Sequence, residues 1–207
     1  MRLLALALTL CAAASADDAH PVLAIGAKAP DFSLPGIDGK VHKLAEYASA
    51  PVLAIVFTCN HCPTAQLYEG RIKKLADDYR GKGVTLVAIE PNDATAIRLD
   101  ELGYTDVSDS LEEMKIRADD HHFNFPYLYD GDTQTTAKAY GCLCTPHVFL
   151  FDRDRRLVYR GQLDDSRPNR GAANGRDLRE AIEAVLMGKP AAANQKPSSG
   201  CGIKWKR

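Results

Sequence analysis

Beyond its first sixteen residues the sequence lacks any apolar run long enough to cross a bilayer as a helix. It also lacks an excess of either charge, since 26 basic and 27 acidic residues leave a formal net charge of −1. This balance argues against nucleic acid or an anionic membrane as the main partner. No internal repeat is visible. These absences predict one soluble domain with a core of its own.

The first residues form a separate pattern. Met1-Arg2 is followed by an uncharged apolar run that ends in Ala14-Ser15-Ala16. A positive start, a short apolar stretch and a small-residue cleavage site are typical of a secretory signal peptide, which we expect to span residues 1–16. The alternative is an N-terminal membrane anchor. A signal peptide predicts export across the inner membrane to a periplasmic or extracellular location, with no membrane span left in the mature chain.

Cysteine is scarce, with six residues in 207. Cys11 lies in the predicted signal, so five cysteines remain after its removal. Export places thiols where disulfides persist. An odd number means that at least one thiol is free, joined to a second chain or used in exchange. Cys59 and Cys62 form the only Cys-x-x-Cys, so no second pair completes a zinc site.

Apolar runs and turn residues predict one mixed α/β domain over residues 17–187. Val52 to Phe57 and Val84 to Ile89 are typical of buried strands, and a helix over 60–79 between them makes a βαβ unit. The other predicted elements are a hairpin within 26–44, helices over 110–122, 133–140 and 175–187, and strands over 127–129, 147–151 and 157–160. Residues 188–207, rich in small and basic residues and without an acidic one, are interpreted as a flexible tail.

The Cys-x-x-Cys directly follows a buried strand and opens the predicted helix. Unpaired N–H groups and the helix dipole stabilise a thiolate at a helix N-terminus, so Cys59 is expected to have a lowered pKa. Cys62 lies one turn further on, within disulfide distance. His61 is expected to favour the thiolate and tune the pair. The alternative is a static disulfide or two buried thiols.

Five segments of the chain, taken together, resemble those of a known protein family, although no single segment would be enough. Residues 26–32 (GAKAPDF), 59–63 (CNHCP), 124–130 (NFPYLYD), 144–146 (CTP) and 200–206 (GCGIKWK) together resemble the peroxiredoxin-like redoxins. These are exported members of the thioredoxin superfamily related to alkyl hydroperoxide reductase. The resemblance covers nearly all of the predicted mature chain.

The resemblance implies a thioredoxin fold, in which a central mixed sheet is flanked by helices. An N-terminal hairpin and a helical insertion before the cis-proline half complete this fold. Cys59 is implied as the attacking thiol and Cys62 as its resolving partner. Pro146 is implied as a cis-proline, which with Thr145 faces the thiol pair; cis peptide bonds are essentially confined to X-Pro.

The chain departs from two relatives. Peroxiredoxins have a threonine three residues before the peroxidatic cysteine, and with Cys62 in that role the position holds Cys59. This departure argues against peroxide reduction, so an atypical thiol peroxidase with an antioxidant role is an alternative and not the preferred prediction. Thioredoxin has a buried carboxylate six residues before its first cysteine, where this chain has Leu53. Proton transfer is assigned instead to Glu90 or His61, with a plain surface position as the alternative for Glu90.

Three more cysteines follow the pair. Cys142 and Cys144 are candidate auxiliary redox thiols. The tail carries the apolar residues Ile203 and Trp205, which favour docking, so Cys201 is expected to pair with Cys142 or Cys144. The alternative is a free Cys201 or one that links two chains.

The alternative to an enzyme is a copper-binding module. It would be similar to the Sco copper chaperones and would use Cys59, Cys62 and Cys144 as ligands, with His147 as an optional fourth, because thiolates select Cu(I). The preferred prediction is a thiol–disulfide oxidoreductase of the cell envelope without a cofactor. Its predicted partners are protein or small-molecule thiols and disulfides, together with an electron donor or acceptor.

Overall fold

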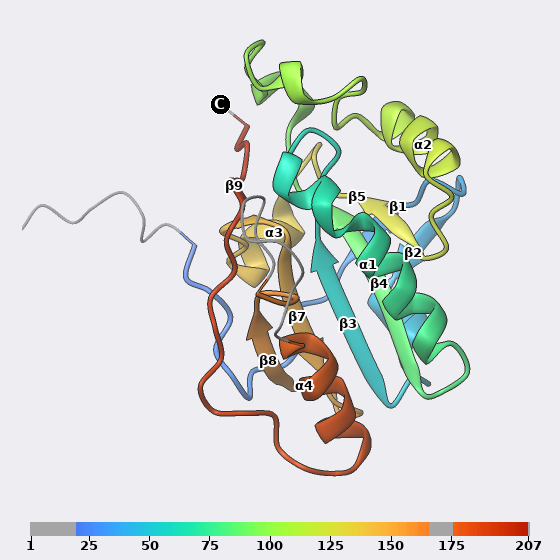
Figure 1. Ribbon diagram of the computed structural model, residues 1–207, viewed down its shortest axis with the longest axis vertical. Helices are drawn as coiled ribbons and strands as arrows, with labels where there is room; N and C mark the ends of the chain where they lie inside the picture. The colour runs from blue at the N-terminus through green and yellow to red at the C-terminus, as the bar shows by residue number, and fades with distance from the viewer. Residues whose placement is uncertain (1–19, 166–175, 207) are drawn as a thin grey trace, which may run out of the picture.

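Five strands form one mixed sheet in the order β5 (Tyr127–Tyr129), β4 (Val84–Glu90), β3 (Val52–Phe57), β7 (His147–Phe151) and β8 (Leu157–Gly161) (Figure 1). The computed structural model describes residues 20–165 and 176–206. Strand β4 is parallel to both β3 and β5, whereas β7 is antiparallel to both β3 and β8. The predicted central mixed sheet is confirmed, and its strands begin and end within one residue of the expected positions.

The central strand β3 is apolar throughout because both faces of the sheet are covered. Alternate side chains of a strand point to opposite faces, so Val56 and Phe57 enter different cores. The first core is covered by α1 (Pro63–Tyr79), α2 (Leu111–Asp120) and α4 (Asp177–Leu186). The second core is covered by α3 (Thr135–Tyr140) and by the N-terminal hairpin. The predicted helices on both sides of the sheet are thus confirmed.

The N-terminal hairpin is also present as predicted. Strand β1 (Ser33–Pro35) pairs antiparallel with β2 (Val41–Lys43), and the 3-10 helix η2 (Leu44–Tyr47) follows. Gly39 turns the chain between the strands with a φ of +77°, a conformation that a residue with a Cβ rarely adopts. Leu34 of the hairpin is buried in the second core.

Helix α1 begins at Pro63, three residues later than the sequence pattern predicted, and Cys62 is its N-cap. Proline suits the first helical position because the N–H group it lacks would have no helical partner there. Residues 59–61 therefore form a loop between β3 and α1 instead of the first turn of the helix.

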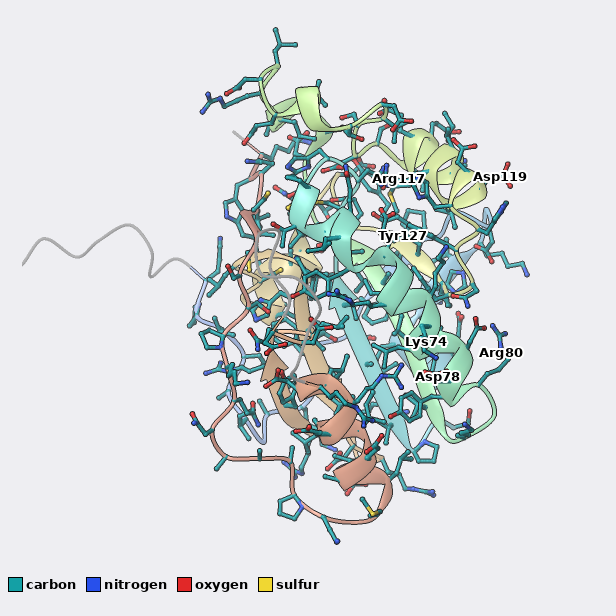
Figure 2. All side chains as sticks on the ribbon, viewed as in Figure 1. Lys74, Asp78, Arg80, Arg117, Asp119 and Tyr127 are labelled. Carbon is teal, nitrogen blue, oxygen red and sulfur yellow. The ribbon has the colours of Figure 1, made fainter. Side chains whose placement is uncertain are left out.

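The connection from β4 to β5 holds the predicted helical insertion. Two 3-10 helices, η3 (Ala94–Ala96) and η4 (Leu102–Tyr104), precede α2. Arg117 of α2, labelled in Figure 2, donates its Nε–H to Glu69 of α1 at 2.6 Å, and both side chains are buried. This ion pair links α2 to α1, and loss of one partner would leave the other buried charge without its closest partner.

The C-terminal residues 188–206 lie along the domain and are drawn in orange-red beside β8 in Figure 1. The Gln195 side chain bonds to the backbone of β8: its Oε1 accepts the N–H of Arg160, and its Nε2 donates to the carbonyl of Val158, both at 2.9 Å. The prediction of a flexible tail is therefore wrong for these residues.

Further along the tail, a short strand binds the domain. Strand β9 (Cys201–Gly202) pairs antiparallel with β6 (Cys144–Thr145). Ile203 and Trp205 pack against the second core. The docking that these two apolar residues favoured is thus confirmed, and it explains why a basic, small-residue segment lies ordered on the surface.

The predicted signal peptide, residues 1–16, lies outside the described residues. Within the described ranges, no helix combines the length and the apolar character that a membrane span requires.

Tyr140 of α3 provides a test of the second core. Its ring is fully buried and lies edge-on to Phe57 and Phe149, each at 5.5 Å, and its hydroxyl donates to the carbonyl of Pro30. We expect Tyr140→Ala to lower the free energy of unfolding in urea by about 4 kcal/mol. Tyr140→Phe, which removes the hydrogen bond to the carbonyl of Pro30, should cost about 1 kcal/mol. The control Leu99→Ala changes a side chain that is 89% exposed and should cost less than about 0.5 kcal/mol; equal losses in all three variants would contradict this account of the core.

Candidate functional site

The two cysteines of the Cys-x-x-Cys lie at the carboxyl end of β3. Cys59 is 2% exposed and Cys62 is fully buried. Thr145 contacts both sulfur atoms: its Oγ1 lies 2.9 Å from Cys59 Sγ, and its carbonyl oxygen accepts the Cys62 thiol at 3.4 Å. The peptide bond from Thr145 to Pro146 is cis, as predicted. The structure thus brings together the four residues that were predicted to be catalytic.

His61 forms a buried pair with Asp109 of the insertion. Its Nδ1 lies 2.5 Å from Asp109 Oδ2, and Asn92 Nδ2 donates to the same oxygen at 2.8 Å. The other oxygen, Oδ1, accepts the backbone N–H groups of Asn60 and His61, each at 2.9 Å. Four N–H donors around one carboxylate hold the Cys-x-x-Cys loop in place.

The other ring nitrogen of His61 is available for chemistry. Because the Asp109 carboxylate only accepts hydrogen bonds, His61 Nδ1 carries a hydrogen. Nε2 is buried and has no hydrogen-bond partner in the described part of the chain. Ligand atoms of Cys59, His61 and Asp109 lie within 4.8 Å of one another. A thiol, an imidazole and a carboxylate therefore form one compact cluster.

Asp109 is a residue that sequence reasoning missed. It stands next to Ser110, the N-cap of α2, where an acidic residue is ordinary. Its partner His61 lies 48 residues earlier in the chain. The contact depends on how the insertion packs on α1, and no local pattern reports that packing.

Glu90 lies inside the site, so the surface position considered as its alternative is wrong. It is fully buried, its Oε1 accepts the N–H of Asn92 at 2.9 Å, and its Oε2 lies 3.2 Å from the hydroxyl of Tyr127, labelled in Figure 2. Burial, and then the charge of Asp109, raise the pKa of Glu90 well above its usual range. This carboxyl group therefore keeps its proton more readily than an exposed one.

The two thiols differ in pKa, but in the opposite sense to the sequence-based expectation. Burial, and then the hydrogen bond with Cys62, raise the pKa of Cys59 well above its ordinary value. Hydrogen bonds with Cys201 and Cys59 lower the pKa of Cys62, and the backbone N–H of Ala65 adds to this effect. The N–H of Ala65 reaches Cys62 because α1 begins at Pro63, later than expected, so the helix N-terminus faces Cys62 and not Cys59.

Cys201 is the third thiol of this site. It is half-buried and packs against the cluster of Cys59, Cys62 and Ala65. In the β6–β9 pair, Cys201 lies opposite Thr145. It therefore lies against Cys62 and not, as expected, in a pair with Cys142 or Cys144. All five cysteines in the described residues are thiols.

Cys142 and Cys144 have no activating neighbour of the kind that Cys62 has. Cys142 is buried in the second core, and burial raises its pKa well above the ordinary value. Burial, and then the charge of Cys62, raise the pKa of Cys144 to about 11. Their predicted auxiliary redox role stays a prediction.

The ligand set of the copper alternative is not assembled. His147 is buried at the start of β7, where its ring lies 4.4 Å from that of Phe149. Burial, and then the charge of Arg160, lower the pKa of His147 to about 4. Over residues 20–165 and 176–206, the one group of three or more possible ligands is Cys59, His61 and Asp109. The expected group of Cys59, Cys62, Cys144 and His147 is thus absent from the described structure.

Comparisons with known proteins place this site in a family. Residues 24–175 match the model of the Redoxin family. A hypothetical protein of Sinorhizobium meliloti is 43% identical with a TM-score of 0.81, and the match covers 90% of this chain and 97% of that one. An uncharacterized conserved protein of Geobacillus kaustophilus is 46% identical with a TM-score of 0.81, over 90% of this chain and 95% of that one.

A more distant structure shows the fold. The thioredoxin domain of a thiol-disulfide oxidoreductase of Bacteroides vulgatus has a TM-score of 0.54 at 16% identity, over 68% of this chain and 89% of that one. No curated protein sequence matches the chain. The chain therefore has the thioredoxin fold and belongs to the Redoxin family of oxidoreductases.

Proposed function

We propose that this protein is a thiol–disulfide oxidoreductase in which Cys59 and Cys62 alternate between a dithiol and a disulfide. The observation that carries the proposal is that Thr145, at the cis peptide bond, lies within hydrogen-bond distance of both sulfur atoms. The two thiols also hydrogen-bond to each other, which supports their joining as a disulfide. A Cys-x-x-Cys between a strand and a helix supports the same reaction.

The proposed reaction requires thiols and disulfides alone. The Cys62 thiolate attacks a substrate disulfide, so that one S–S bond breaks, a mixed disulfide forms and one substrate thiol leaves. Cys59 then attacks the Cys62 sulfur, which releases the second substrate thiol and leaves a Cys59–Cys62 disulfide. The protein has lost two electrons, which a donor dithiol returns. The reverse sequence oxidises a substrate dithiol.

This order exchanges the roles that the family resemblance implied for the two cysteines. The exchange rests on the position of Cys62 as N-cap of α1 and on the three groups that stabilise its thiolate, Cys201, Cys59 and the N–H of Ala65. A thiolate is the reactive form of cysteine, so the thiol with the lowered pKa starts the exchange.

His61 is proposed to take the proton that Cys59 loses. The pKa of Cys59 is raised, so its thiol needs a base before it can attack. The His61 ring belongs to the cluster that contains Cys59, its Nε2 is buried without a partner in the described residues, and Asp109 fixes the ring by its bond to Nδ1. Glu90, whose raised pKa lets it keep its proton, adds little negative charge beside the thiols.

We also propose that the reaction takes place outside the cytoplasm, in the periplasm or beyond it. The signal-peptide pattern of residues 1–16 supports this location. The proposed substrates are protein or small-molecule thiols and disulfides, with a separate electron donor or acceptor. No metal or organic cofactor enters the proposed steps.

The function is tested by dithiothreitol-driven reduction of insulin disulfides. We expect catalysis in the unchanged protein, and we expect Cys59→Ser and Cys62→Ser each to lose it by a factor of about 100 or more. Cys144→Ser is the matched control and should keep it. Turnover of hydrogen peroxide that is faster than disulfide reduction would replace the proposal with the thiol peroxidase alternative.

The position of the thiolate gives a pH-dependent prediction. An ordinary thiol, with a pKa of about 8.5, becomes unreactive as the pH falls toward 6 because it takes up a proton. The lowered pKa of Cys62 keeps its thiolate at that pH, so alkylation by iodoacetamide should continue there. We expect this low-pH reaction to persist in Cys59→Ser and to disappear in Cys62→Ser. The opposite result would restore Cys59 as the attacking thiol.

Asp109 is predicted to act through the ring of His61. Asp109→Asn keeps an acceptor for backbone N–H groups but favours the tautomer with the hydrogen on Nε2, which then no longer accepts a proton. We expect insulin reduction to fall about 10-fold or more, with a changed pH profile between pH 5 and 8. Asp106→Asn, at a side chain that is 79% exposed, is the control. An unchanged pH profile in Asp109→Asn would show that the pair has a structural role alone.

A further inference from the structure

The C-terminal segment places a third sulfur atom on the thiol pair. Cys201 of β9 lies opposite Thr145 of β6, and the Thr145 carbonyl accepts the Cys62 thiol. Cys201 also packs against the cluster that contains Cys59 and Cys62. Cys62 therefore has one thiol neighbour from its own loop and one from a segment about 140 residues further along the chain.

The C-terminal segment approaches β6 so closely that a side chain at position 200 would not fit. A Cβ added to Gly200 would lie 1.9 Å from the carbonyl oxygen of Thr145, whereas a Cβ added to Gly202 would meet nothing within 4 Å. Glycine at position 200 is thus a condition for the contact between β9 and β6. Two glycines in one short segment provide a matched pair for experiment.

Polar contacts beyond β9 hold the segment in register. The backbone N–H of Lys204 donates to Asn92 Oδ1, and its carbonyl accepts from Gln134 Nε2, both at 2.9 Å. The backbone N–H of Lys206 donates to Gln134 Oε1 at 2.7 Å. Asn92 and Gln134 are both fully buried. Buried amides that bond to the tail would lose these partners if it left, so its docked position is specified by the fold.

We propose that Cys201 is a third redox thiol, which exchanges with the Cys59–Cys62 disulfide to form a disulfide between Cys62 and Cys201. This inference rests on the proposed function, because it needs the Cys59–Cys62 disulfide as its reactant. It adds an internal step in which the disulfide passes from the loop to the C-terminal segment.

The step balances without an external oxidant or reductant. The Cys201 thiolate attacks the Cys62 sulfur, the Cys59–Cys62 bond breaks, and the Cys62–Cys201 bond forms. Cys59 leaves as a thiolate and takes up the proton that Cys201 released, by way of solvent or His61. One disulfide and one thiol are present before and after the step, so the chain gains and loses no electrons.

The different exposure of the three cysteines indicates what this step would achieve. Cys59 and Cys62 are buried, whereas Cys201 is half-buried and can be reached from solvent. A donor dithiol can then attack Cys201 and release the Cys62 thiolate. The hydrogen bond with Cys59 and the backbone N–H of Ala65, which lower the pKa of Cys62, remain in this state and make Cys62 a good leaving group, because a thiol of low pKa leaves faster. The donor thus reduces the buried pair without entering it.

Disulfide mapping tests the proposal. Trypsin leaves Cys59 and Cys62 in peptide 44–71, Cys142 and Cys144 in 139–153, and Cys201 in 180–204. In the purified protein oxidised with oxidised glutathione and quenched with acid, we expect peptide 44–71 joined to 180–204. Cys59→Ser should retain this link, and Cys62→Ser should reduce its yield at least 10-fold. Cys144→Ser is the control and should leave it unchanged.

The variant Cys201→Ser separates this inference from the proposed function. It should form the disulfide within peptide 44–71 and should be reduced by dithiothreitol at least 10-fold more slowly than the unchanged protein. If Cys201→Ser forms that disulfide but Cys59→Ser yields no link to 180–204, the inference is wrong and the proposed function stands. If Cys201→Ser forms no disulfide within 44–71, the proposed function fails.

Gly200→Ala and Gly202→Ala test the docking itself. Gly200→Ala should lower the rate of the link between 44–71 and 180–204 at least 10-fold and should speed the alkylation of Cys62 in the reduced protein. Gly202→Ala should change neither rate. Circular dichroism checks that both variants fold. If this link forms at equal rates in the two variants, it does not depend on the β6–β9 contact, and the inference is wrong.

Discussion

Thr145 is the residue at which three parts of the chain meet. Its hydroxyl contacts Cys59, its carbonyl accepts the thiol of Cys62, and its backbone pairs with Cys201. Two of these three contacts use the backbone, so they depend on the path of the chain through β6 and the cis peptide bond more than on the type of side chain. The geometry of the sulfur atoms is therefore set by how β6 is held, between the sheet on one side and the C-terminal segment on the other.

Two buried acidic side chains, Asp109 and Glu90, lie near the thiol pair and differ in their hydrogen-bond partners. Asp109 accepts four N–H donors, one of them from the ring of His61, and these bonds offset the cost of its burial. Glu90 has fewer donors, and its pKa rises well above the usual range. The site thus contains one carboxyl group that holds the ring of His61 and one that keeps its proton more readily than usual.

The parts of this structure that local sequence patterns describe were predicted well. Unbroken apolar runs gave β3 and β4 their positions, and Pro146 was placed correctly beside the thiol pair. The predicted start of α1 is three residues too early although Pro63 marks the true one: the Cys-x-x-Cys pattern favours a helix that opens at the pair, whereas proline prefers the first helical position. Asp109 and the docking of Cys201 on Cys62 depend on contacts between distant segments, for which one sequence carries no local signal.

The docked C-terminal tail affects both the access to the thiol pair and the pKa of Cys62. Asn92 bonds to the Lys204 backbone through Oδ1 and to Asp109 through Nδ2, so the tail and the His61 pair share one buried amide. The hydrogen bond from Cys201 is the largest of the effects that lower the pKa of Cys62. If the tail leaves, Cys62 loses this bond and with it the largest effect that lowers its pKa, while the burial that raises its pKa also decreases. One segment thus both packs on the thiol pair and stabilises the Cys62 thiolate, so access to the site and the reactivity of this thiol depend on the same contact.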